Sequence, residues 1–188
     1  MIIFKKILKW VFFIFVGLFI LAEIIRLPFR LQEEKTAEQV AKIHATKLTL
    51  DDVMGKNLPP DPGAEADKTI AGIDANKNGI RDDVELAVFK AYPNSAKTRA
   101  VLLQYAIALQ MEFTQPIVNK DTVTATVQEE DRAYICVISI NDTNKLIDFV
   151  KQKQLNNNTR KDFRANYYEK VGSYESLDHK CDIDISTF

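Results

Sequence analysis

The sequence is poor in several residue types, and each shortage excludes a class of protein. Two cysteines and two histidines in 188 residues are too few for a cysteine-rich zinc module. Six glycines and six prolines argue against collagen-like, low-complexity and turn-rich all-β chains. The chain also lacks G-x-S-x-G, H-E-x-x-H and glycine-rich phosphate-loop motifs, so no motif marks it as an enzyme.

The charge balance gives no sign of nucleic-acid binding. Lys and Arg total 25 and Asp and Glu total 26, which leaves a net charge of −1. Nucleic-acid-binding proteins usually carry a basic excess, so we expect no nucleic-acid partner. Hydrophobic residues make up 46% and charged residues 27%, a composition typical of a folded chain rather than a disordered one.

An apolar run near the N-terminus predicts a membrane segment. Residues 10–22 contain no charged or strongly polar side chain, and the 21 residues from Ile7 to Leu27 would form a helix about 30 Å long, which matches a bilayer core. A cleaved signal peptide and an uncleaved anchor both remain open. The small-x-small cleavage pattern is missing, which favours the anchor. We therefore predict a transmembrane helix over residues 1–28.

Basic residues before this run indicate the orientation. Lys5, Lys6 and Lys9 precede it and, by the positive-inside tendency, keep the N-terminus in the cytoplasm. We therefore expect a single-pass membrane protein whose C-terminal domain lies outside the cytoplasm, in a bacterial periplasm. The two cysteines, Cys136 and Cys181, would then form a disulfide in an oxidising compartment. Two unrelated reduced thiols are the alternative.

The rest of the chain predicts an all-α fold. Residues 29–56 form a helical stalk, in which Thr49 caps a short helix that Gly55 ends. The stretch N-L-P-P-D-P-G at 57–63 is a linker, so the extracytoplasmic domain spans 57–188. Hydrophobic spacing predicts a small bundle of about four to five helices over 82–92, about 95–114, 120–139, 142–155 and 159–171. The alternating pattern of the tail C-D-I-D-I-S-T-F, residues 181–188, predicts a short strand.

One segment, D-A-N-K-N-G-I-R-D-D-V-E at residues 74–85, has the spacing of a calcium loop. Calcium takes six to eight oxygen ligands, which a loop supplies from alternate positions around a glycine turn. Gly79 stands at the sixth position, where the loop turns. The expected metal ligands are Asp74, Asn76, Asn78, the backbone carbonyl of Ile80, Asp82 and Glu85. A polar turn that caps a helix is the alternative.

The segment resembles the EF-hand-like calcium loops of bacterial exported proteins, dockerins and thrombospondin type 3 repeats. The resemblance covers 12 of 188 residues, and the rest of the chain resembles no family that we can name. It differs from paired EF-hands because Arg81 replaces the usual apolar residue at position eight, with Ile80 one place earlier. The resemblance implies an unpaired loop with Ca²⁺ as cofactor. Three carboxylates predict an affinity of about 10⁻⁴ to 10⁻³ M and a mainly structural role.

Other polar groups are weaker candidates. Asp178, His179, Cys181, Asp182 and Asp184 suit either a transition-metal site or a plain polar tail, and the single histidine favours the tail. We expect the adjacent acids of the 120–139 helix to form a solvated face rather than a glycosidase pair, and the stalk histidine to be solvated. These residues are Glu129, Glu130 and His44. Four aromatic residues favour a core stripe over a groove: Phe163, Tyr167, Tyr168 and Tyr174.

Three functions follow from these features. The first is a membrane-anchored extracytoplasmic calcium-binding protein that interacts with a protein partner. The second is a periplasmic inhibitor or immunity-type protein that blocks a partner enzyme with its helical face. The third is a hydrolase with an unrecognised site, and the absence of a catalytic motif makes it the least favoured.

Overall fold

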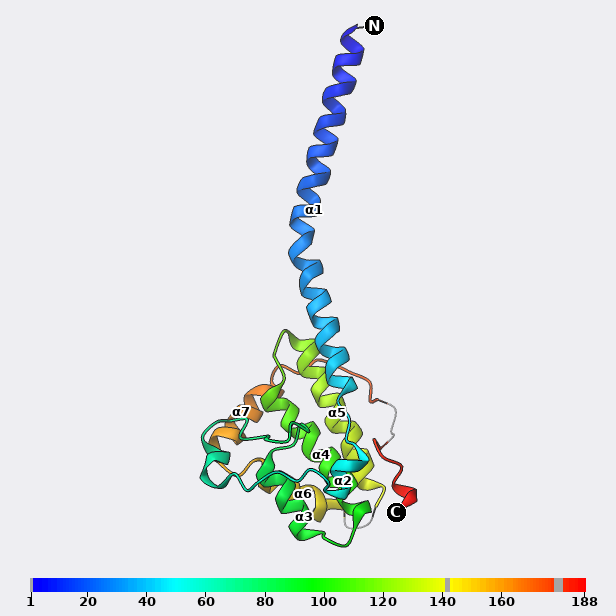
Figure 1. The fold of residues 1–188 in the computed structure, drawn as a ribbon. Helices are drawn as coiled ribbons and strands as arrows, with labels where there is room; N and C mark the ends of the chain where they lie inside the picture. The colour runs from blue at the N-terminus through cyan, green and yellow to red at the C-terminus, as the bar shows by residue number, and fades with distance from the viewer. Residues whose placement is uncertain (1, 141–142, 178–180) are drawn as a thin grey trace. The chain divides into compact units, whose positions relative to one another are not determined.

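The regular elements of the described chain are all helical, as the hydrophobic spacing predicts. The computed structural model describes residues 2–140, 143–177 and 181–188 (Figure 1). Its α-helices are α1 (Ile2–Ala45), α2 (Leu50–Met54), α3 (Asp82–Ala91), α4 (Ala96–Thr114), α5 (Lys120–Ile138), α6 (Thr143–Gln154) and α7 (Asn158–Tyr168). Two short 3₁₀ helices, η1 (Gly63–Asp67) and η2 (Ile185–Thr187), complete them.

Helix α1 carries the apolar run. It continues through Pro28, which contributes no backbone donor but does not end the helix. An 18-residue window within it has a mean hydropathy of 2.3, and its side chains are exposed to the surroundings. This helix is therefore long and apolar enough to cross a membrane, a property that an anchor and a signal sequence share.

The chain divides into two units, residues 1–38 and 39–188. The second unit begins at Gln39, earlier than the domain boundary that we predicted at residue 57. Ile43, Leu48 and Val53, which we assigned to the stalk, are buried in the hydrophobic core. The stretch from 39 to 56 thus belongs by its contacts to the compact unit.

Helix α4 forms the centre of this unit (Figure 1). Every residue from Arg99 to Phe113 is buried, because α2, α3, α5 and α6 pack around it. Its polar side chains are buried and have polar partners, although Gln104 Nε2 and Glu112 Oε2 make no hydrogen bond with a described residue. For example, Arg99 Nε donates to the carbonyl of Val53 at 2.9 Å. These partners explain how a helix with glutamines and a glutamate can be buried on all of its faces.

The helix ends follow the predicted caps in most places. Thr49 forms a capping box with Asp52, and Gly55 ends α2 in the left-handed conformation with φ of 69°. Helix α7 begins at Asn158, close to the predicted residue 159, because the Asn157 side chain accepts the capping hydrogen bond. It ends at Tyr168 and does not reach residue 171.

The prediction of a C-terminal strand is wrong. Residues 185–187 form η2, whose first turn is capped by the Asp184 side chain, an acceptor from the backbone N–H of Ser186. Ile183 and Ile185 pack against the core. The alternation of apolar and polar residues that suggested a strand therefore reflects two anchoring isoleucines on either side of a capping acid.

Candidate metal centre

The 74–85 segment folds as a tight loop that leads directly into α3. The backbone N–H of Asp82 donates to the carbonyl of Ile73 at 2.9 Å and closes the base of the loop. Two residues inside it have positive φ, Lys77 at 59° and Gly79 at 85°. Glycine takes this conformation without steric cost, which accounts for Gly79 at the turn.

Side-chain oxygens line the inside of this turn. Asp74 accepts hydrogen bonds from the backbone N–H groups of Asn78 (3.2 Å) and Gly79 (2.9 Å). Asn78 Oδ1 in turn accepts from the N–H of Ile80 at 2.9 Å. The oxygens of the first and fifth loop positions are therefore held on the inner side by the backbone that turns around them.

The last two predicted ligands are buried at the start of α3. Asp82 and Glu85 are each 1% exposed. Asp82 accepts from the N–H of Ala75 at 3.0 and 3.2 Å, and Glu85 Oε2 accepts from the Asn76 amide at 3.1 Å. Burial raises the pKa of Asp82, and it raises the pKa of Glu85 to about 7. Both carboxylates thus lie where a cation would offset the cost of their burial.

Arg81, the departure from the EF-hand pattern, has a clear structural role. Its side chain is fully buried and donates to the carbonyls of Lys153 (2.6 Å) and Gln154 (3.1 Å) in α6. It also pairs with Asp83 at 2.5 Å. Arginine at position eight therefore attaches the loop to α6 in place of the contact that a second EF-hand would make.

A buried arginine also holds the chain that enters the loop. Arg160 of α7 donates to the carbonyls of Ala66 (2.7 Å), Thr69 (3.0 Å) and Ile70 (2.9 Å) and pairs with Asp67. Only the 3₁₀ turn η1 precedes the loop, so the full entering helix of an EF-hand is replaced by these hydrogen bonds. The described loop is thus a single loop with one exiting helix.

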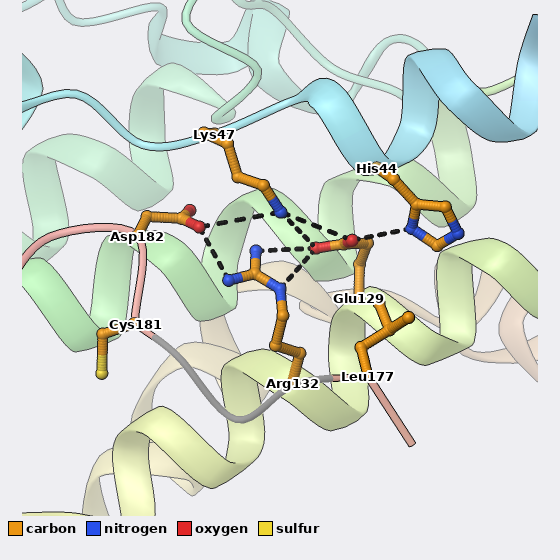
Figure 2. Close-up of a pocket in the computed structure, with 7 residues that line it drawn as sticks. All are labelled: His44, Lys47, Glu129, Arg132, Leu177, Cys181 and Asp182. Carbon is orange, nitrogen blue, oxygen red and sulfur yellow. Dashed lines mark hydrogen bonds and ion pairs between the residues drawn. The ribbon is translucent and has the colours of Figure 1, made fainter. Parts of the chain in front are cut away.

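A second group of polar side chains lines a pocket of about 480 Å³ (Figure 2). Arg132 of α5 donates to Glu129 at 2.7–2.8 Å and pairs with Asp182 at 2.7 Å. His44 at the end of α1 lies 2.8 Å from Glu129, and Lys47 lies 3.2 Å from Glu129 and 3.8 Å from Asp182. We call these five residues the ionic cluster. It joins three distant parts of the chain.

Two predictions about these residues are wrong. Glu129 and Glu130 are 1% and 8% exposed, so they do not form a solvated face. His44 is about a third exposed and contacts Glu129, so it is not free in solvent. The neighbouring cations and His44 lower the pKa of Glu129 against the effect of its burial. Charges matched in this way indicate a structural group.

The disulfide prediction is confirmed in the structure, because Cys136 and Cys181 are bonded. Cys136 is buried in α5, and Cys181 precedes Asp182 of the ionic cluster. The bond therefore holds the C-terminal segment against α5. It closes a sequence separation of 45 residues.

The structure does not support the second candidate metal site, which we considered near the C-terminus. Asp178 and His179 lie outside the described residues. Cys181 is in the disulfide, Asp182 belongs to the ionic cluster, and Asp184 caps η2. Over the described residues, His, Cys, Asp and Glu side chains do not gather in threes that could hold a metal. A site at residues 74–85 therefore depends also on amide and carbonyl oxygens.

A pocket of about 570 Å³ opens beside the loop. Asp74, Asn76 and Asn78 line it from the loop, and Asp52 lines it from α2. The Asn76 amide also donates to the carbonyl of Asn57 at 2.9 Å, just after α2. Solvent therefore reaches the oxygen-bearing face of the loop from the side of α2.

A further buried ionic group lies between α4, α5 and α7. Arg164 pairs with Glu112 and, at 2.7 Å, with Glu130. Burial raises the pKa of Glu112 to about 8, whereas Arg164 and the Tyr168 hydroxyl keep the pKa of Glu130 below its ordinary value despite its burial. One arginine thus serves two acids, of which Glu112 holds its proton more tightly.

Comparisons with known proteins give no relative. No family model matches the chain, and neither a curated protein nor a solved structure is significantly similar to it. Arguments about function therefore start from the residues themselves.

Proposed function

We propose that residues 74–85 bind Ca²⁺ and that the protein is a membrane-anchored, extracytoplasmic calcium-binding interaction protein. The ion stabilises the fold and is not consumed in a reaction. The observation that carries the proposal is the loop, in which Asp74, Asn78 and Glu85 come from alternating or terminal positions around a glycine turn.

The electrostatics of α3 support a structural role for the ion. Asp82, Asp83 and Glu85 all lie in the first turn of this helix, and two of them are buried. The helix dipole favours acids at these positions, but the acids repel one another. A divalent cation between them would remove the repulsion and hold the start of α3, next to the attachment that Arg81 makes to α6.

Two structural facts support a location outside the cytoplasm. One helix is apolar and long enough to span a membrane, and the cysteines are paired. Disulfides persist mainly in oxidising compartments. Calcium at millimolar concentration would load a loop of weak affinity there.

The test is thermal unfolding of the full chain in detergent micelles, with calcium, with magnesium and with chelator. At 10 to 100 times its Kd, a ligand that binds only the folded state adds roughly 1.5–2.7 kcal/mol, which raises Tm by several degrees. We expect this rise with calcium but only weakly with magnesium, which demands a smaller octahedral shell. Asp74→Ala should abolish the rise.

Asp162→Ala is the matched control, because Asp162 is an exposed acid of α7 outside the loop. It should keep the full response to calcium. If calcium leaves the Tm of the wild type unchanged, residues 74–85 are a polar turn and the proposal fails. The partner is addressed separately, by affinity capture with the calcium-loaded protein and with Asp74→Ala.

A further inference from the structure

A small pocket lies along α5 and is lined by residues that do not belong to the ionic cluster. Its volume is about 180 Å³, below the roughly 300–1,000 Å³ of sites for drug-sized ligands, so it admits only a small group. Tyrosines and acids dominate its lining: Tyr105, Tyr134, Tyr168, Tyr174, Glu130 and Asp131. All of these residues belong to the compact unit.

The two acids of this pocket differ in their partners. Glu130 is satisfied, because Arg164 donates to both of its oxygens at 2.7 and 2.9 Å and Tyr105 donates at 3.1 Å. Asp131 Oδ2 is shielded from solvent and accepts no hydrogen bond from any described residue. A buried carboxylate oxygen without a donor is costly, and a ligand with N–H groups would supply what it lacks.

The tyrosines provide the second element. Tyr134, Tyr168 and Tyr174 are each about 40% exposed, so part of each side chain is open to a ligand. Aromatic rings attract cations through the negative charge of their faces. Burial, together with the charges of Asp131 and Glu130, raises the pKa of Tyr174, as expected for a hydroxyl beside two acids.

Arg164 already makes such a cation–π contact with the ring of Tyr168. Its guanidinium carbon lies 4.7 Å from the centre of the Tyr168 ring. That cation compensates Glu130 and leaves Asp131 without a positive partner among the described residues. Lys151 of α6 also lines the pocket, but no ion pair links it to Asp131 within the described chain.

From these contacts we infer that the pocket binds a small primary alkylammonium group. The ammonium pairs with the Asp131 carboxylate and lies against the rings of Tyr134 and Tyr174. The Asp131 carboxylate, which lacks the compensation that Arg164 gives Glu130, disfavours an anion. A neutral ligand would leave the Asp131 carboxylate without a countercharge. This site is independent of the calcium loop, so either proposal stands if the other fails.

The test is binding of n-butylammonium, with 1-butanol as a neutral analogue, by ligand-observed NMR. The full chain is kept in maltoside micelles, because detergents with amine or ammonium head groups would compete. We expect butylammonium to bind at least about tenfold more tightly than butanol, since a hydrogen bond to a charged group is the stronger kind. Equal affinities would overturn the inference.

Three variants locate the ligand. Asp131→Asn keeps the shape of the side chain and should weaken butylammonium binding about tenfold or more. Tyr134→Leu should weaken it about fivefold through loss of one ring face. Lys151→Met removes a competing ammonium and should strengthen binding severalfold. If Lys151→Met abolishes binding, the pocket does not recognise a cation and the inference is wrong.

Asp148→Asn is the matched control, because Asp148 is an exposed acid of α6 that does not line the pocket. Its affinity should equal that of the wild type. Circular dichroism and Tm verify that each variant is folded. An Asp131→Asn protein that is folded and binds butylammonium as well as the Asp148→Asn control would overturn the inference.

Discussion

The amide of Asn76 donates a hydrogen bond to Glu85 Oε2 over 3.1 Å, and this bond joins the third and twelfth positions of the 74–85 loop. It brings a neutral oxygen-bearing side chain and a buried carboxylate together across the turn. The two residues that an ion would have to bridge are therefore already neighbours. For both residues to supply oxygen to a cation, the Asn76 amide would have to turn its Oδ1, which accepts from the N–H of Asn78 at 3.4 Å, towards Glu85.

Glu85→Gln should weaken calcium binding by about an order of magnitude or more, because position twelve supplies the bidentate carboxylate of such loops. The substitution keeps the size of the side chain and removes a buried charge. The Tm without metal should therefore not fall. Isothermal titration of the full chain with calcium measures the affinity.

Glu65→Gln is the control for this change, since Glu65 is an exposed residue of η1 and pairs only at the surface with Lys68. It should bind calcium as the wild type does. Equal affinity of Glu85→Gln and Glu65→Gln would remove Glu85 from the ligand set.

Arg132→Met should destabilise the fold far more than His44→Ala. Arg132 pairs with two acids whose side chains are only 2% exposed, and its loss leaves them short of positive charge, at a cost of about 3–5 kcal/mol. His44 is partly exposed, so its contact with Glu129 contributes about 1 kcal/mol or less. Urea unfolding of both variants measures the difference. Similar losses would contradict the structural role of the ionic cluster.

The stability of the metal-free protein should fall as pH rises from about 4.5 towards about 8. Burial raises the pKa of Glu112 to about 8 and that of Glu85 to about 7, so the folded state holds protons that the unfolded state has released. Above pH of about 7, the slope belongs mainly to Glu112. Glu112→Gln should flatten it there, while Glu65→Gln should not.

The pH profile is read from urea unfolding in chelator at several pH values. The lowered pKa of Glu130 acts in a separate window, because its stabilisation is lost only as pH falls below the ordinary range of a glutamate. A wild-type profile that rises between pH 7 and 8 would contradict the assignment of the proton to Glu112.

Much of the fold could be predicted because local signals and packing agree. Thr49 and Gly55 bracket α2, and Ser95 caps α4, as the residue types alone indicate. The loop backbone could be anticipated for the same reason, since Gly79 takes the positive φ that the turn needs. Whether calcium binds there is a prediction still to be tested.

The buried charges could not be predicted in the same way. Glu129 and Glu130 look like an exposed face, because a sequence window contains neither His44 nor Asp182 nor Arg164. Their partners lie up to 85 positions away. Two adjacent acids on an amphipathic helix indicate burial only when their pairing with Arg132 of α5 and Arg164 of α7 is known. The boundary at residue 57 was misplaced for a related reason, since the core partners of Ile43 and Leu48 lie in later helices.

The bond from the backbone of Leu48 to Asp182 spans 134 positions of the chain, and that span sets an order of assembly. During synthesis, His44, Lys47, Glu129 and Arg132 exist long before Asp182 does. A nascent chain that ends between α5 and Cys181 holds Arg132 with one of its two acids and Cys136 as a thiol. Contacts of such long range also form slowly. The ionic cluster and the disulfide can therefore be completed only after residues 181 and 182 have been made.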